Sequence, residues 1–278
     1  MVDAAKPDVP LTGVKLRVVP ALQGSLWVKH GLRAFFQQPL GFAGLYGAVV
    51  FAGMLLMSIP VIGTVAVIAL TPTITLAFMR AVQFTLSGQR FGVTVLIDVW
   101  RAAPQRRQAQ IKLGLLYCVC VAAVLVLLAA TASNTTALKD LLNGTDAARE
   151  AALQDPALLR AMLLSMLAYV PVSIAFWHAP ALVQWAGQSV GKALFFSIMA
   201  CWHNRWAFTM FGLAWGGVVF MAATIAATLA TALQSPQALE LAMIPIAVIF
   251  GASFYASLYF SIVDCFEQKA PDSINRSA

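Results

Sequence analysis

A long stretch without any ionisable side chain places the strongest constraint on this chain. Residues 40–79 contain no Asp, Glu, Lys, Arg or His. The same is true of three further segments, 113–138, 206–239 and 241–263. A fourth, 161–191, contains His178 as its one ionisable side chain. A membrane-spanning helix needs about 20 apolar residues, so each stretch is long enough to cross a bilayer.

Composition supports the same fold class. Charged residues make up 10% of the chain and hydrophobic residues 60%, with a mean hydropathy of +0.81, whereas a soluble domain is about a quarter charged. So few charges cannot cover a water-soluble protein of 278 residues. We therefore predict an all-α, polytopic transmembrane helical bundle, with further amphipathic helices at its cytoplasmic interface.

The apolar stretches resolve into about six spans. A helix over 40–79 would be about 60 Å long, twice the hydrocarbon thickness, and Pro60 within Ser58–Gly63 supplies a break. We predict a six-helix transmembrane domain over 21–266. Its expected spans are 40–58, 62–82, 111–131, 159–182, 207–231 and 241–264.

The basic residues predict the orientation of the bundle. Of the 18 Lys and Arg residues, only Lys139, Arg149 and Arg160 fall on the side that holds the loop over 132–158. The other fifteen lie before the first span, after the sixth span, in or beside the segment between the second and third spans, or in the segment between the fourth and fifth spans. Lys and Arg accumulate on the cytoplasmic side, so we expect both termini in the cytoplasm.

The two ends of the chain read as tails. Pro7, Pro10 and Pro20 oppose helix in residues 1–20, which we interpret as a disordered cytoplasmic tail. Residues 267–278 are expected to form a second cytoplasmic tail. The loop over 132–158 is predicted to be an external cap, too short for a separate domain.

Three cytoplasmic segments, 22–37, 91–103 and 188–203, are too apolar for ordinary loops. They are typical of helices that lie in the headgroup plane, with aromatic and basic side chains at the lipid boundary; alternatively, they pack against the end of the bundle. The net charge of +7 then favours anionic lipid and requires no nucleic acid. The predicted interface anchors are Trp27, Lys29, Arg33, Trp100, Arg101, Lys192, Trp202 and Arg205.

No motif predicts catalysis, a cofactor or a metal site. Residues 187–191 fit the G-x-S-x-G pattern of serine hydrolases, but that chemistry needs a strand–turn–helix context, and Ser189 follows a predicted span. We expect an interfacial turn there and no enzyme. Cys118 and Cys120 are two residues apart on a helix and face different directions. His178 lies near a predicted span boundary, where it serves either packing or the handling of a ligand or proton.

Small and hydroxyl side chains predict helix packing. Gly44, Ala48 and Ala52 recur at every fourth position, as do Gly212 and Gly216, a spacing that allows close helix contact. A last set lines one face of the sixth span and is expected to form interhelical hydrogen bonds or, alternatively, a polar path: Ser253, Ser257 and Ser261.

A short match hints at an internal repeat. Gly88-Gln89 and Gly187-Gln188 each follow a proline-containing span, and each is followed by an apolar segment that leads into another span. Chance and duplication explain this match about equally well. A parallel repeat is found in some transporters, without establishing transport.

Several segments together carry a family resemblance: Trp27–Phe35, His178–Val183, Lys192–Asn204 and Tyr259–Phe266. With them the chain resembles a group of uncharacterised bacterial six-span inner-membrane proteins. The resemblance implies a bacterial inner-membrane location and brings no catalytic residue with it.

Two hypotheses of function follow. The first is a non-enzymatic membrane component that binds lipid, a membrane-protein partner or a second copy of itself. The alternative is a transporter or permease-like subunit. The sequence names no transported solute and no partner.

Overall fold

The computed structural model describes residues 15–132, 136–232, 234 and 236–267. Within these ranges the secondary structure is helical, apart from an isolated β-bridge between Leu16 and Phe266. Six helices are long and apolar enough to cross a membrane, which confirms the predicted all-α class and span number. They are α2 (Pro39–Met57), α3 (Ile62–Leu86), α5 (Pro104–Ala132), α8 (Pro156–Phe176), α11 (Arg205–Ala232) and α12 (Pro236–Cys265).

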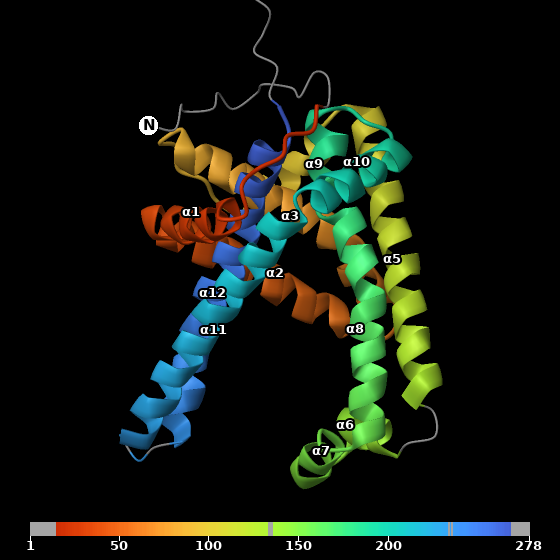
Figure 1. The fold of residues 1–278 in the computed structure, drawn as a ribbon, viewed down its shortest axis with the longest axis vertical. Helices are drawn as coiled ribbons and strands as arrows, with labels where there is room; N and C mark the ends of the chain where they lie inside the picture. Colours follow the sequence, from red (N-terminus) through yellow and green to blue (C-terminus); the bar gives the residue numbers. More distant parts are fainter. Residues whose placement is uncertain (1–14, 133–135, 233, 235, 268–278) are drawn as a thin grey trace, which may run out of the picture.

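The spans form two diverging pairs (Figure 1). The α5–α8 pair and the α11–α12 pair separate from one another away from the end that holds α9 (Ala179–Trp185) and α10 (Val190–His203). Between the pairs, α3 packs against α5, α2 and α12, and α2 packs against α12. The Leu16–Phe266 bridge brings the two described ends of the chain together. We call the end with α1 (Gln23–Gln37), α9 and α10 the predicted cytoplasmic end.

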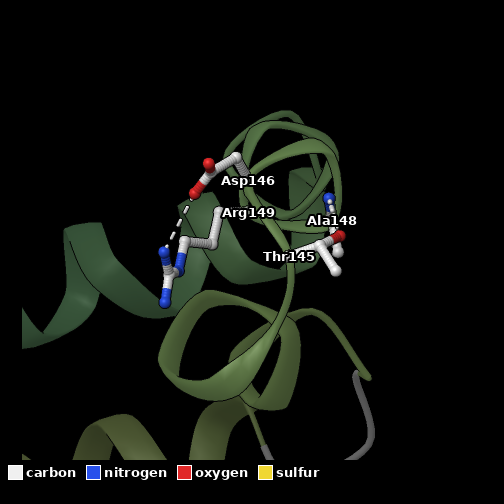
Figure 2. A network of polar contacts seen from close by, with 4 residues as sticks. All are labelled: Thr145, Asp146, Ala148 and Arg149. Atoms are coloured by element: carbon white, nitrogen blue, oxygen red, sulfur yellow. Dashed lines mark hydrogen bonds and ion pairs between the residues drawn. The ribbon is translucent and has the colours of Figure 1, made fainter.

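A small helical cap closes the opposite end of the α5–α8 pair. It consists of α6 (Ala137–Asn143) and α7 (Asp146–Ala152). Figure 2 shows how α7 begins: the Thr145 hydroxyl accepts a hydrogen bond from the Ala148 N–H at 3.3 Å, and Arg149 pairs with Asp146 at 3.1 Å. Capping of this kind satisfies backbone donors that a helix start leaves unpaired.

Close contacts around α3 form the centre of the core. Phe78 and Met79 are fully buried, and the Phe78 ring stacks on Tyr255 of α12 with 5.1 Å between centroids. Gly114 of α5 lies against the Ala69 carbonyl of α3, where a Cβ would collide with the backbone. Lower in the α5–α8 pair, the Tyr117 and Tyr169 hydroxyls are 2.7 Å apart. The core therefore joins the two pairs through α3.

The fourth span, predicted as one helix over 159–182, is broken. α8 ends at Phe176 and α9 begins at Ala179, with Pro180 in its first turn. Proline has no N–H to donate and its ring crowds the preceding turn. The Ser197 hydroxyl of α10 bridges the break: it accepts from the His178 N–H at 3.0 Å and donates to the Ile174 carbonyl at 2.8 Å.

The three interfacial segments differ in structure. Residues 22–37 and 188–203 contain the expected helices α1 and α10. Residues 91–103 hold only α4 (Val95–Asp98) and the 3-10 helix η1 (Val99–Arg101). Ala102 is extended, with φ −64° and ψ 165°, and Ala103 precedes Pro104, a position that disfavours helix. The helical part of this segment is therefore shorter than predicted: one α-helical turn continued by a 3-10 helix, over residues 95–101.

The tails are described only in part. Residues 1–14 and 268–278 lie outside the described residues. Residues 15–20, which the sequence assigned to a disordered tail, are held by specific bonds. Arg17 N–H donates to the Cys265 carbonyl at 2.9 Å, and the Asn204 side chain bonds the Val19 N–H at 2.8 Å and the Arg17 carbonyl at 2.9 Å.

The glycines of the small-residue stripes make no close helix contact among the described residues. A Cβ added at Gly44, Gly212 or Gly216 would meet nothing within 4 Å. Other glycines provide the close approaches, among them Gly24 and Gly31 of α1. The hydroxyl prediction holds for Ser261, which bonds across helices to Trp177 and His178 at 3.3 and 3.2 Å.

Candidate functional site

Helix α1 is packed on the ends of two spans rather than lying free at the lipid boundary. A Cβ at Gly31 would lie 2.6 Å from the Ser253 carbonyl oxygen and from the Ser257 Cβ of α12. A Cβ at Gly24 would lie 2.6 Å from the Phe211 nitrogen of α11. Because both positions are glycine, the α1 backbone approaches both spans closely.

A carboxylate of α12 fixes α1 in place. Asp264 Oδ2 accepts hydrogen bonds from Gln23 Nε2 and Trp27 Nε1, each at 2.7 Å. Trp27 is fully buried and its ring contacts Phe208, with 5.2 Å between centroids. A side chain with no exposed surface cannot reach lipid, so the prediction of Trp27 as an interface anchor is corrected. It joins α1 to α11 and α12 instead.

The remaining predicted anchors have accessible side chains. Trp100 is half-buried, and Trp202 is 64% exposed. Arg101 pairs with Asp98 at 3.2 Å. The other basic anchors are exposed and have no carboxylate partner among the described residues: Lys29, Arg33, Lys192 and Arg205.

His30 adds little charge to this surface. Burial lowers the pKa of its imidazole, and the neighbouring Lys29 and Arg33 also lower it, while Asp264 raises it. Its ring contacts Phe260 of α12, with 5.1 Å between centroids. At neutral pH the positive charge of this region therefore comes from lysine and arginine.

The break between α8 and α9 encloses a polar cluster. The His178 side chain is fully buried; its Nε2 lies 3.2 Å from the Ser261 hydroxyl and its Nδ1 lies 4.0 Å from the Cys201 sulfur. Contacts from α10, α11 and α12 cover the ring: Cys201, Phe208 and Ser261. Burial raises the pKa of the Cys201 thiol, which leaves it protonated and a poor nucleophile.

The G-x-S-x-G segment has the geometry of a helix start. Ser189 is exposed and precedes α10 as its N-cap residue, with φ −65° and ψ 154°. Gly187 has a φ of +61°, and Gly88 in the matching segment has a φ of +70°. Both glycines have a left-handed φ, whereas the helices that follow, α4 and α10, differ in length. Neither segment forms the strand–turn–helix that a nucleophilic serine requires.

Among the described residues, no group of three His, Cys, Asp or Glu side chains is placed to hold a metal ion. A pocket of about 480 Å³ lies instead between α8 and α11, beside α10. One charged side chain, Arg205, lines it. Its aromatic lining residues are Trp177, Trp202, Phe208, Phe211, Trp215 and Phe254. Arg205 and Trp202 were predicted as separate interface anchors. The pocket itself was not predictable from local sequence, because its wall comes from four helices.

Comparison with known proteins agrees with an inner-membrane location. A curated protein of Burkholderia thailandensis, named as a probable inner membrane protein, is 34% identical to the chain over 260 residues. The aligned part covers 93% of this chain and 96% of that protein. The chain belongs to this family of bacterial inner-membrane proteins. No protein-family model matches it, and no solved structure is found to be similar.

Family membership and structure together define the class of molecule. The inner-membrane protein crosses the bilayer with six helices, and the shared region extends over nearly the whole of both chains. The predicted resemblance is thereby confirmed. The relative's name specifies a location and no activity.

Proposed function

We propose that this inner-membrane protein is a non-enzymatic membrane component that binds anionic lipid at the cytoplasmic face. The supporting observation is the set of exposed basic side chains at the predicted cytoplasmic end, without carboxylate partners among the described residues: Lys29, Arg33, Lys192 and Arg205. Each basic group near an anionic membrane surface contributes about 1 kcal/mol of attraction.

Aromatic side chains support the same proposal. Trp202 and Trp206 are 64% and 65% exposed on either side of the turn between α10 and α11. The Arg205 guanidinium lies 5.7 Å from the Trp206 ring centroid. Tryptophan favours the membrane–water boundary because its ring is apolar and its N–H is polar. Arginine and tryptophan at the same level fit the headgroup region of one leaflet.

A charge-removal experiment tests this proposal. The full chain, with Lys29→Gln, Arg33→Gln and Lys192→Gln combined, is placed in nanodiscs of equal phosphatidylglycerol and phosphatidylcholine. The lipids that stay bound after gentle release are counted by native mass spectrometry. We expect the enrichment of phosphatidylglycerol over phosphatidylcholine to fall at least about tenfold.

The matched control removes Lys139, Arg149 and Arg160 at the opposite end by the same Gln substitutions. This control should keep the enrichment of the unchanged protein. An equal enrichment in all three proteins would overturn the proposal. A stoichiometric protein partner from native membranes, bound without enrichment of anionic lipid, would also overturn it and favour the binding of a partner protein.

The broken fourth span supports a second candidate function, a transporter or permease-like subunit. Interrupted helices with polar groups line the substrate sites of several transporter families, and the break here encloses His178, Ser197 and Ser261. Proteoliposome flux of candidate solutes tests it. Flux that is abolished by His178→Phe, in a protein that keeps its fold, would favour transport over lipid binding alone.

A further inference from the structure

We propose that the pocket between α8 and α11 holds one acyl chain of an anionic phospholipid from the cytoplasmic leaflet, with the lipid phosphate bound by Arg205. The inference rests on the proposed lipid-binding function and adds a defined site to it. This site would retain one lipid, whereas lipids at the basic surface would exchange with the bilayer.

The wall of the pocket suits a hydrocarbon chain. Trp177, Phe208 and Phe211 meet edge to face, with 5.5 and 5.7 Å between the Trp177 centroid and the two phenylalanine centroids. Trp215 and Phe254 extend this wall, with 5.9 Å between their centroids. The volume of about 480 Å³ lies within the range of about 300–1,000 Å³ that is typical of small-ligand sites.

The hydroxyl groups of the wall are already bonded within the protein. Ser173 Oγ donates to the Val170 carbonyl at 2.9 Å, and Thr209 Oγ1 donates to the Arg205 carbonyl at 2.9 Å. An occupant therefore meets aromatic rings and few free polar groups below Arg205. A polar solute would lose its hydration in such a pocket without regaining hydrogen bonds.

The length of the pocket matches one leaflet. Arg205 is the first residue of α11, and Trp215 lies ten positions further along the same helix. At 1.5 Å per residue, the pocket extends about 15 Å along the helix axis. This is about half of the 30 Å hydrocarbon core. A lipid with its phosphate at Arg205 would place its acyl chain along this wall.

Charge selects the headgroup. Arg205 is exposed, lines the pocket and has no carboxylate partner among the residues that the structure describes. None of the residues that line the pocket is acidic. A guanidinium forms two parallel hydrogen bonds with a phosphate, and the absence of carboxylates favours a lipid with net negative charge over a zwitterionic one.

Glycine positions on α11 allow a matched test. Gly212 lines the pocket, whereas Gly217, five residues further along the same helix, does not. A Cβ at either position meets nothing within 4 Å, so both accept a larger side chain without a backbone clash. In Gly212→Leu the new side chain would occupy the pocket. In Gly217→Leu it would lie elsewhere on α11.

The experiment measures bound phospholipid on the full chain by native mass spectrometry, after incubation with phosphatidylglycerol or phosphatidylcholine. We expect one retained phosphatidylglycerol on the unchanged protein and on Gly217→Leu, and about a tenfold lower occupancy on Gly212→Leu. Arg205→Gln should reduce the preference for phosphatidylglycerol about fivefold. Thermal melting of each variant shows whether it is folded.

The outcomes separate this site from the general surface preference. Equal retention by Gly212→Leu and the unchanged protein would overturn the pocket assignment, as would equal retention of the two lipids by the unchanged protein. The surface variant with three Gln substitutions keeps Arg205 and should retain the single lipid. If the surface variant loses the enrichment of phosphatidylglycerol but keeps the pocket lipid, both the surface binding and the pocket site are supported. If the unchanged protein shows the enrichment but retains no single lipid, the pocket site is refuted and the surface binding still holds.

Discussion

Ser197 takes the place of a backbone hydrogen bond inside the fourth span. In a continuous helix the His178 N–H would bond the Ile174 carbonyl directly; here the Ser197 hydroxyl lies between them at 3.0 and 2.8 Å. Ser197→Ala leaves the buried His178 N–H unpaired and leaves the Ile174 carbonyl with only the weak Cys201 thiol donor at 3.8 Å. We expect a loss of about 1–3 kcal/mol in the free energy of unfolding, measured in mixed detergent micelles.

A second serine supplies the comparison for this prediction. Ser58 is exposed, and its hydroxyl donates to the Leu55 carbonyl at 2.7 Å. Water can replace that bond, so Ser58→Ala should change stability by less than about 0.5 kcal/mol. Equal losses in the two variants would mean that the bridge at the helix break does not stabilise the protein.

The burial of single side chains was predictable from the sequence for some residue types and not for others. The exposure of the basic side chains was predictable, because charge is costly to bury at any position. The burial of Trp27 was not predictable, since the sequence pattern around it fits a lipid-facing tryptophan equally well. Its acceptor, Asp264, is 237 residues away in the chain. Only the folded arrangement distinguishes a buried tryptophan from an interfacial one.

At the scale of elements, the packing of α1 on α12 depends on one small residue, Gly31. Gly31 lies where α1 packs against α12, and a Cβ there would lie 2.6 Å from the Ser253 carbonyl oxygen. Gly31→Ala should therefore destabilise the protein by about 1–3 kcal/mol despite the better helix propensity of alanine. Limited proteolysis should also cut near α1 more rapidly, because the helix would detach more often.

Gly44 provides the opposite case on α2. It is exposed, and a Cβ there meets nothing within 4 Å. Gly44→Ala should therefore leave stability unchanged or increase it by up to about 1 kcal/mol. If Gly31→Ala behaved in the same way as Gly44→Ala, the close docking of α1 on α12 would be refuted.

The elements themselves were largely predictable from local sequence. The end of α2 at Met57 and the start of α3 at Ile62 follow from Pro60 and its neighbours, and the spans follow from hydropathy. The contacts between elements were less accessible. Every fourth small residue on α2 and α11 suggested helix contact, yet Gly44 and Gly212 are exposed. Spacing identifies a smooth helix face and does not identify what covers it.

The whole molecule has two chemically different ends. The Leu16–Phe266 bridge places both described chain ends together, on the side with most of the basic residues. The α6–α7 cap at the other end (Figure 1) holds three carboxylates and two basic side chains: Asp140, Asp146, Glu150, Lys139 and Arg149. Since lysine and arginine favour the cytoplasmic side, we predict that reporters fused after Ala278 or inserted near Gln105 are cytoplasmic and that one inserted near Gly144 is external. Paired reporters active on only one side of the membrane measure this directly. A cytoplasmic signal near Gly144 would contradict the predicted orientation. Because Arg205 would then lie on the external side, the proposed lipid site would also lie in the outer leaflet.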